Sequence, residues 1–482
     1  MKIVFAASEA APFIKTGGLG DVAQALPSAL SEYKGNEVLL FLPYYKSVKN
    51  NPAFSVERVA EFEVQLSWRS SYVGLMRLKS KKRKLQVYFI DNEYYFGGRE
   101  SSYGDYDDGE RFAYFCKAIL ESLVYMNETP DVIHCNDWQT ALVPTLLHAF
   151  YGDTLGKAKT VFTIHNIEYQ GWANPDFLGE VLGLSSDYKS TFGYNGAFNF
   201  VKGAILSCDA LTTVSQTYAK EICYPYFAHG LSYVINDHSF KLSGIINGID
   251  MDGNDPATDK NLPANYDAKT SAQGKASCKA QIQKQLGLPV REDVPLIGLV
   301  SRLVGHKGLD IMCDAMDEIM SRDVQFVILG TGDSLYESKL AQAAERYPDK
   351  LSLNLCFSKS MASQIYGASD IYLMPSKSEP CGLSQLLAMR YGSVPVVHET
   401  GGLKDTVIPF NYGTGEGLGF TFQGFSKDEL MDGLNRALDI YFNNKKAWEK
   451  AVYNGMTTDF SWKKPAEEYM QIYRNLQANN MQ

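Results

Sequence analysis

Short apolar runs that suit β-strands alternate with amphipathic stretches that suit helices along almost the whole chain, and the alternation is interrupted once. Before residue 247 the predicted strands are Ile3–Ala7, Val38–Leu42, Val87–Ile90, Val132–His134, Thr160–His165, Leu211–Val214 and Gly244–Ile246. After residue 291 they are Leu296–Val300, Val324–Leu329, Leu351–Leu355, Ile371–Met374 and Val394–Val397. This order of elements is typical of parallel sheets covered by helices on both faces. The sequence therefore predicts an α/β protein of two Rossmann-like, doubly wound domains that face each other across a cleft.

The interruption sets the expected domain boundaries. Residues 247–291 are rich in Asp, Asn, Pro, Gly, Ser and Lys and hold only short apolar pieces, which predicts an interdomain linker region. We expect one Rossmann-like domain at 1–246, a second at 292–456, and a C-terminal helix within 457–482 that packs back on the first domain. The length of 482 residues suffices for two cores at the usual ~100–200 residues per domain.

The composition excludes several kinds of partner. The 46 basic and 55 acidic residues give a formal net charge of −9, so the chain has no overall basic field for nucleic acid or an anionic membrane. Its apolar runs are shorter than the ~18 residues of a membrane-spanning helix, and Ile3–Ala7 is shorter than the core of a signal peptide. The eight cysteines include no CxxC pair and are expected to be reduced. We therefore expect a cytoplasmic protein with neither a nucleic-acid nor a membrane partner.

A glycine-rich loop, Lys15–Val22, follows the first predicted strand and precedes a helical run. Its glycines let the backbone turn tightly, the helix start offers free N–H groups, and Lys15 adds a point charge, which together predict a phosphate site. A plain glycine turn with a solvated lysine fits the same residues. The loop also matches a relaxed dinucleotide fingerprint, but the second strand ends without the acid that would bind a ribose, so a dehydrogenase fits poorly.

Polar side chains gather where predicted strands end. Asp137 and the pair His165 and Asn166 follow two strands of the first domain, and Arg302 and Lys307 follow a strand of the second. Catalytic side chains collect at such strand ends in this architecture. Two cations suit a diphosphate leaving group, because its charge grows as its bond to a sugar breaks. A hydrogen-bonded core histidine and solvated surface cations are the plain alternatives.

The sequence also contains two kinds of acidic motif. Glu379–Gln385 lies at the predicted start of a helix, where N–H groups hold phosphate and a carboxylate binds a sugar hydroxyl, although the helix dipole alone also favours an acid there. The triplets Asp105–Asp107 and Asp250–Asp252 have the DxD pattern of some metal sites, but such triplets arise by chance in an acidic chain. We assign the chain neither a metal nor an organic cofactor.

Nine segments, taken in order, resemble the bacterial glycogen synthases and plant starch synthases, and the resemblance covers the chain from end to end. Its carriers are Lys15–Val22, Asp91–Tyr95, Glu110–Phe112, His134–Trp138, Thr163–Gln170, Asn247–Asp250, Ser301–Asp310, Glu379–Gln385 and Thr400–Leu403. The resemblance implies a retaining glycosyltransferase of the GT-B type, with the glucan on the side of the first domain and the sugar nucleotide on the side of the second. It implies transfer of glucose from ADP-glucose to the non-reducing 4-hydroxyl of an α-1,4-glucan such as glycogen.

The same resemblance implies roles for single residues. The implied catalytic residues are Glu379, His165, Asp137, Arg302 and Lys307. The implied substrate-binding residues are Lys15, Gly18, Asp21, Tyr95, Asn166, Asn247, Cys381, Gly382 and Ser384. The sequence departs from the family pattern at His306, where glutamine is usual, and at Phe357, where a tyrosine near the nucleotide base is common.

Three alternatives to this reading stay open. The donor could be UDP-glucose, because the motifs do not identify the nucleotide base of the donor. A sucrose- or trehalose-type synthase would share the cations and Glu379 but not the Lys15–Val22 loop as it stands here. A catalytically silent glucan-binding protein would not need Lys15, Arg302, Lys307 and Glu379 intact.

Overall fold

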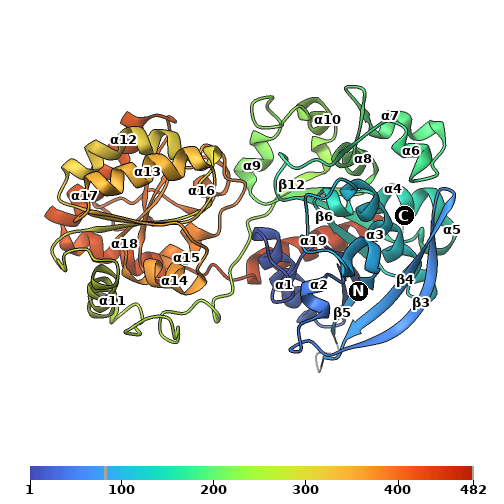
Figure 1. Ribbon diagram of the computed structural model, residues 1–482, viewed down its shortest axis with the longest axis horizontal. Coiled ribbons are helices and arrows are strands. Elements are labelled where there is room, and N and C mark those ends of the chain that lie inside the picture. The colour runs from blue at the N-terminus through green and yellow to red at the C-terminus, as the bar shows by residue number, and fades with distance from the viewer. Residues whose placement is uncertain (81–83, 480–482) are drawn as a thin grey trace. The chain divides into compact units, whose positions relative to one another are not determined.

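The computed structural model describes residues 1–80 and 84–479, which form two compact units (Figure 1). Unit 1 is Met1–Asn247 together with the segment that begins at Trp462, and unit 2 is Gly248–Ser461. Most of the region 247–291, expected to be a linker, therefore lies inside unit 2, where it holds helix α11 (Ser271–Gln285). Tyr266 and Ile282 from this region are buried in the unit 2 core, so its polar composition conceals a packed element.

The described residues of unit 1 form a nine-stranded sheet in the order β12-β11-β7-β6-β1-β2-β5-β4-β3. All neighbouring strands from β12 to β5 are parallel, whereas β4 pairs antiparallel with both β5 and β3. The strands are β1 (Lys2–Ala6), β2 (Glu37–Pro43), β3 (Val56–Leu66), β4 (Arg69–Leu78), β5 (Leu85–Asp91), β6 (Val132–Asn136), β7 (Lys159–Ile164), β11 (Ala210–Thr213) and β12 (Leu242–Gly244).

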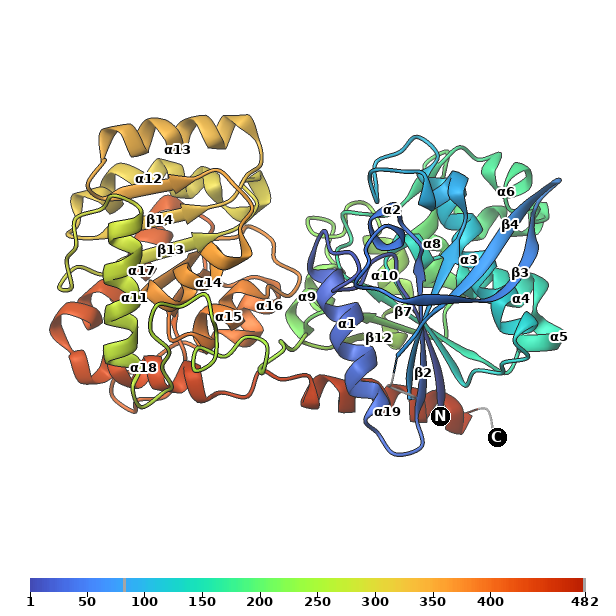
Figure 2. The ribbon, with the colours of Figure 1, turned by 60° about the horizontal axis from the view of Figure 1, so that its bottom comes forward.

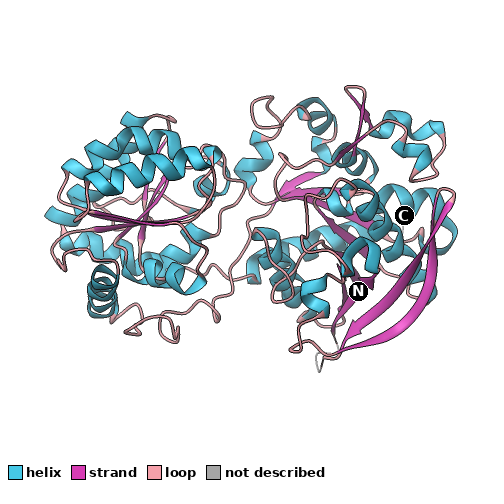
Figure 3. Cartoon of the chain, in the orientation of Figure 1, coloured by secondary structure: helices cyan, strands magenta, loops and turns pink. Residues whose placement is uncertain are grey.

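The β3–β4 hairpin at the edge of this sheet is absent from the sequence-based prediction (Figure 3). Most β3 side chains are exposed or half-buried, and polar residues alternate with apolar ones, so no continuous apolar run marks the strand. A second, small sheet joins β8 (Trp172–Ala173), β10 (Ala197–Asn199) and β9 (Gly193–Tyr194). Strands with one solvated face give a weaker sequence signal than the buried parallel strands beside them.

Unit 1 contains both long and short α-helices. They are α1 (Gly18–Ser31), α2 (Lys46–Lys49), α3 (Asp108–Tyr125), α4 (Val143–Phe150), α5 (Gly152–Leu155), α6 (Phe177–Glu180), α7 (Lys189–Phe192), α8 (Phe200–Ser207), α9 (Gln216–Glu221), α10 (Ser232–Asp237) and α19 (Lys463–Asn479). Helix α1 continues through Pro27, which is buried. Helix α19, from the far end of the sequence, lies beside α1 (Figure 2).

A buried histidine ties α19 to the sheet. His134 on β6 is fully buried, with Nδ1 2.6 Å from the Tyr473 hydroxyl and Nε2 2.6 Å from the Thr163 hydroxyl. Burial lowers the pKa of His134 to about 3, so its imidazole is neutral at physiological pH. This histidine belongs to the core. In the motif His134–Trp138, the candidate site residue is Asp137 and not His134.

The neutral His134 predicts a loss of stability in acid. In the unfolded chain the His134 imidazole binds a proton near pH 6.5, whereas in the folded chain it binds one only near pH 3. The free energy of unfolding therefore falls as the pH drops between these two values. For this group the free energy of unfolding changes by at most roughly 1.4 kcal/mol per pH unit.

We expect the thermal unfolding midpoint of a His134→Asn variant to depend less steeply on pH between 7 and 5 than that of the wild type. His148, which is exposed, supplies the control: His148→Asn should keep the wild-type slope. Equal slopes in all three proteins would contradict this role of His134.

Unit 2 contains, in its described residues, a six-stranded parallel sheet in the order β15-β14-β13-β16-β17-β18. Helices α12 and α13 cover one face, and α14 and α15 cover the other (Figure 1). The strands are β13 (Leu296–Val300), β14 (Gln325–Leu329), β15 (Leu351–Asn354), β16 (Ile371–Met374), β17 (Val394–His398) and β18 (Phe420–Phe422). Besides α11, the helices are α12 (Leu309–Ser321), α13 (Ser334–Arg346), α14 (Lys359–Ala368), α15 (Ser384–Arg390), α16 (Gly401–Thr406), α17 (Lys427–Asn443) and α18 (Lys445–Thr457).

Two further features bear on the class of protein. The eight cysteines all lie in the described residues and form no disulfide there, and five of them are buried. Within the described part of the chain, no helix is both long enough and apolar enough to span a bilayer.

Candidate active site

The glycine-rich loop of unit 1 leads into α1, which begins at Gly18. The Lys15 ammonium lies 2.7 Å from the Asp21 carboxylate, so two of the predicted site residues form an ion pair across the loop. A Cβ on Gly20 would lie 2.9 Å from Cγ of Lys15, which shows how closely the lysine stem folds over the start of α1. The N–H groups of Gly17 and Gly20 are already bonded to a carboxylate of the chain, that of Glu9. Two of the N–H groups that were expected to be free for a phosphate are therefore already engaged by the protein.

Asp137 and His165 meet at the carboxyl ends of β6 and β7. The Asp137 carboxylate accepts a hydrogen bond of 2.8 Å from the His165 backbone N–H, and burial raises the pKa of Asp137 to about 7. Its backbone has a φ of 56°, a conformation that is uncommon for a residue other than glycine and often marks a functional position. Asn166 follows directly and accepts from the Glu168 backbone with its side-chain oxygen.

The hydrogen bonds of His165 define its tautomer. Nε2 lies 2.9 Å from Oδ1 of Asn136, whose amide nitrogen donates to the Ala6 carbonyl at 3.0 Å and thereby fixes the orientation of the amide. Burial lowers the pKa of His165 to about 3, so the ring is neutral, with its proton on Nε2. Nδ1 has no hydrogen-bond partner among the residues that the structure describes and is left as an acceptor.

Tyr95 and Asn247 are both buried. Tyr95 is 4% exposed, stacks on Tyr114, and donates its hydroxyl to Glu110 at 2.8 Å, whereas its neighbour Tyr94 is 61% exposed. In this conformation the Tyr95 hydroxyl is therefore engaged by the protein. Asn247 is 5% exposed, and its side-chain oxygen has no hydrogen-bond partner in the described part of the chain. A buried amide oxygen without a partner is rare and marks a position that a ligand can complete.

The two acidic triplets have structural roles. Asp105 accepts from both Arg99 and Arg111 at 3.1 Å, and Asp107 accepts from Arg99 at 2.6 Å. Asp250 accepts from the backbone of the two residues Asp252 and Gly253 in a tight turn. The described residues contain no group of three or more His, Cys, Asp or Glu side chains that could hold a metal ion.

In unit 2 the central contact joins Lys307 to Glu379. The Lys307 ammonium lies 2.7 Å from Oε2 of Glu379, which also accepts a hydrogen bond of 3.0 Å from the Ser376 hydroxyl. The Glu379 side chain is 8% exposed and that of Lys307 is 17% exposed, so this ion pair is largely removed from water. Arg302, by contrast, is exposed, and its guanidinium has no ion-pair partner among the described residues. Of the two predicted site cations of unit 2, Lys307 is paired and Arg302 has no ion-pair partner among the described residues.

Glycines allow the loops that carry these charges to pack tightly. Gly308, directly after Lys307, has a φ of 74°, and a Cβ there would lie 1.9 Å from the Pro375 carbonyl oxygen. A Cβ on Gly402 would lie 2.0 Å from the Cys381 carbonyl oxygen, and the Gly402 N–H donates to the Glu379 carbonyl at 3.0 Å. Side chains at these positions would push the charged loops apart.

A helix begins within Glu379–Gln385, as expected, but the residues directly after Glu379 form a turn that precedes it. Helix α15 begins only at Ser384, whose hydroxyl lies 3.4 Å from the Met374 sulfur. Gly382 has a φ of 74°, and Gln385 donates to the carbonyls of both Cys381 and Gly382. Cys381 is buried within this turn. Glu379 therefore owes its place to the turn and to Lys307 rather than to the start of a helix.

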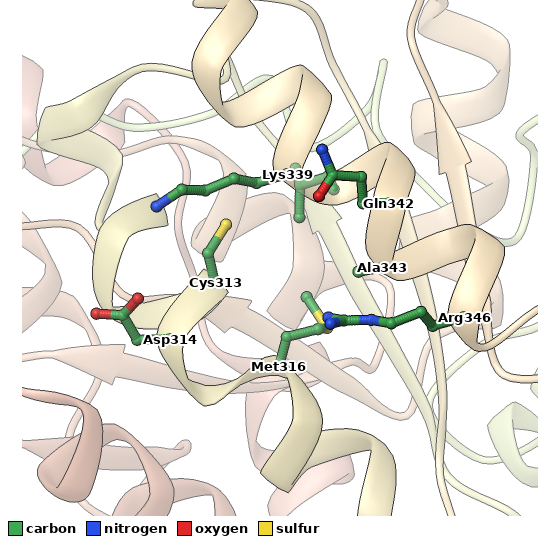
Figure 4. Close-up of a pocket in the computed structure, with 8 residues that line it drawn as sticks. Cys313, Asp314, Met316, Lys339, Gln342, Ala343 and Arg346 are labelled. Carbon is green, nitrogen blue, oxygen red and sulfur yellow. The ribbon is translucent and has the colours of Figure 1, made fainter.

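A hollow elsewhere in unit 2 carries none of the predicted site residues. It has a volume of about 160 Å³ and lies between α12 and α13 (Figure 4). Its lining residues are Cys313, Asp314, Met316, Lys339, Leu340, Gln342, Ala343 and Arg346. Burial raises the pKa of Cys313 to about 11, so its thiol is not a ready nucleophile. This hollow gives no reason to move the candidate site away from Lys307 and Glu379.

Known proteins are similar to this chain over nearly its whole length. Residues 2–237 match the starch synthase catalytic domain, and residues 281–455 match the glycosyl transferases of group 1. A glycogen synthase of Clostridium novyi is 47% identical over 481 residues, which is 99% of each chain, and one of Streptococcus agalactiae is 48% identical over 99% of this chain and 100% of its own. The chain belongs to the glycogen synthase and starch synthase family. It is accordingly a glycosyltransferase, as the resemblance predicted.

Two solved structures are similar to this chain over 99% of its length. The catalytic domain of starch synthase IV from Arabidopsis thaliana, bound to ADP and acarbose, is 35% identical, with a TM-score of 0.90 over 99% of both chains. A sucrose-phosphate synthase from Thermosynechococcus elongatus is 17% identical, with a TM-score of 0.61 over 99% of both chains, and supports the fold alone. The predicted GT-B architecture of two Rossmann-like domains is confirmed for this family member.

Proposed function

We propose that this glycosyltransferase transfers glucose from ADP-glucose to the non-reducing 4-hydroxyl of an α-1,4-glucan such as glycogen, with retention at the anomeric carbon. The observation that carries the proposal is the largely buried contact between Lys307 and Glu379, with the exposed Arg302 in the same strand-to-helix segment as Lys307. This arrangement combines a carboxylate for a sugar hydroxyl with two cations for a diphosphate. The relatives named glycogen synthase and the starch synthase structure bound to ADP support the choice of substrates.

In unit 2, Arg302 and Lys307 would stabilise the diphosphate as it departs. Lys307 is held by Glu379 in this structure, so binding of the diphosphate adds a second anion to a cation that is already in place. Glu379 would bind the transferred glucose, and the turn formed by Cys381, Gly382 and Ser384 would hold the adjoining part of the donor.

In unit 1, Lys15 and Gly18 would bind the donor phosphates, with Asp21 beside them. His165, Asp137, Asn166 and Asn247 would bind glucose hydroxyls. The neutral His165 offers Nδ1 as an acceptor, and the unpartnered oxygen of Asn247 offers a second one.

Tyr95 would act from within the protein. Its hydroxyl is donated to Glu110 in this conformation, so we propose that it supports the neighbouring loop, on which Tyr94 is exposed.

The proposed reaction balances without any further reagent. The bond from the anomeric carbon to the diphosphate oxygen breaks, the bond to the acceptor 4-hydroxyl oxygen forms on the same face, and the departing diphosphate takes the acceptor proton. The protein's part is to position the reactants and to stabilise the growing charge. Lysine and arginine supply the positive charge, and the proposal includes no metal. We place the reaction in the cytoplasm, which suits eight free cysteines.

A comparison of acceptors tests this function against the enzymes of similar fold. With ADP-glucose as donor, we expect glucose to be incorporated into glycogen and not into fructose or glucose 6-phosphate. Sucrose- or trehalose-type synthesis would instead give a low-molecular-weight product. Failure to transfer to any of the three acceptors would favour a silent glucan-binding protein and overturn the proposal.

A further inference from the structure

A buried carboxylate organises the glycine-rich loop of unit 1. Glu9 follows β1 and is 2% exposed. Its two oxygens accept hydrogen bonds from the backbone N–H groups of Thr16 at 2.8 Å, Gly17 at 3.1 Å and Gly20 at 3.0 Å, and the Thr16 hydroxyl donates to it as well. One side chain thus receives four donors that lie within five consecutive residues of the loop.

These bonds decide which N–H groups of the loop stay available. At the start of α1, Gly17 and Gly20 are engaged by Glu9, whereas the N–H groups of Gly18 and Leu19 make no hydrogen bond to any residue in 1–80 or 84–479. Gly18 is exposed, and Lys15 precedes it by three residues. The loop therefore presents two adjacent backbone donors near a lysine, while the others are held by the protein itself.

The energetic reason for a carboxylate at this place is local. The first N–H groups of a helix have no partner within the helix and carry a partial positive charge. A loop with glycines at positions 17, 18 and 20 loses much conformational freedom when it becomes ordered. Hydrogen bonds to a charged acceptor are about twice as strong as neutral ones, so Glu9 can offset that cost before any ligand binds.

We propose that Glu9 is a positioning residue, which holds the loop from Lys15 to Gly20 in the conformation that presents Gly18, Leu19 and Lys15 to the phosphates of the donor. The inference rests on the proposed role of the loop in donor binding. Glu9 itself does not touch the donor, since all four of its hydrogen bonds are made to the loop. Its effect is on donor binding and not on acceptor binding.

The test compares Glu9→Gln with a matched control, Glu128→Gln. Glutamine keeps the size of the side chain but turns an amide N–H group toward the loop donors, so the four bonds no longer fit. Glu128 pairs with Lys2 at the opposite end of β1, and its side chain is 23% exposed. We expect Glu9→Gln to raise the KM for ADP-glucose and the Kd for ADP about tenfold or more, with the KM for glycogen within about twofold of wild type. Glu128→Gln should change none of the three.

Two results would overturn the proposal: unchanged donor constants in Glu9→Gln, or an equal rise of the donor and glycogen KM values. Lys15→Ala separates this failure from that of the underlying function. If Lys15→Ala weakens ADP binding and Glu9→Gln does not, only the role of Glu9 is wrong; if neither does, the donor role of the loop is wrong.

Hydrogen exchange of the wild-type protein keeps the proposal testable if Glu9→Gln does not fold. A peptide covering residues 13–20 should show slow exchange at the amides bonded to Glu9 before ADP is added, and uniformly fast exchange there would contradict the proposal.

Discussion

Replacement of Lys307 by alanine should lower kcat by roughly two to three orders of magnitude, the scale for loss of one group that stabilises a developing charge. In the proposed mechanism Lys307 would supply positive charge where the diphosphate departs, and its ammonium lies 2.7 Å from the Glu379 carboxylate. Its loss also leaves the Glu379 carboxylate, which is 8% exposed, without its counter-ion, so the group proposed to bind the sugar would be disturbed as well. Initial rates at saturating ADP-glucose and glycogen measure this effect.

The companion variants separate charge from geometry. Lys307→Arg keeps the charge and should retain more activity than Lys307→Ala. Lys339→Ala, on α13, removes a lysine that lines the hollow between α12 and α13 and should leave kcat unchanged. Turnover of Lys307→Ala close to wild type would remove this residue from the mechanism.

Replacement of Glu379 by glutamine should abolish most turnover while ADP remains bound. The substitution keeps the volume of the side chain but removes the charge that would bind a glucose hydroxyl, and we expect kcat to fall by about two orders of magnitude. The same substitution releases Lys307 from its ion pair, so the Kd for ADP should stay the same or decrease. Calorimetric titration with ADP, alongside initial rates, measures both quantities.

Glu449→Gln is the matched control, since Glu449 is an exposed carboxylate on α18 of the same unit. It should leave both kcat and ADP binding as in wild type. Loss of ADP binding in Glu379→Gln, with the control intact, would contradict the sugar-binding role and assign Glu379 to the nucleotide or phosphate part of the site.

Most of the parallel strands were predictable because they are short, largely apolar runs, whereas β18, with only three residues, was missed. Strand β13 carries no polar side chain, and β6 keeps its apolar character despite His134 and Asn136. The β3–β4 hairpin was missed because its exposed side chains break the apolar pattern. Helix α11 was missed for a related reason: its inward-facing side chains include Lys275 and Lys279, whose ammonium groups are satisfied by carbonyl oxygens and by Asp370.

The site was predictable in its residues but not in its contacts. The charges Lys15, Lys307 and Glu379 were visible in the sequence, but their contacts were not. The pair of Lys15 and Asp21 depends on the fold of one loop, and the pair of Lys307 and Glu379 depends on turns that bring two distant loops together. Glu9 carries no motif of its own, because its role is defined by hydrogen bonds to a loop seven to eleven residues away. A single acid between a strand and a glycine-rich loop was the only signal available.

A donor competition with glycogen as primer tests the central claim most directly. Radiolabelled ADP-glucose should transfer its glucose to glycogen, and an excess of unlabelled UDP-glucose should leave the incorporation nearly unchanged. The label should be released as glucose by an enzyme that cleaves α-1,4 linkages. Incorporation from labelled UDP-glucose alone, or no incorporation from either donor, would contradict the account.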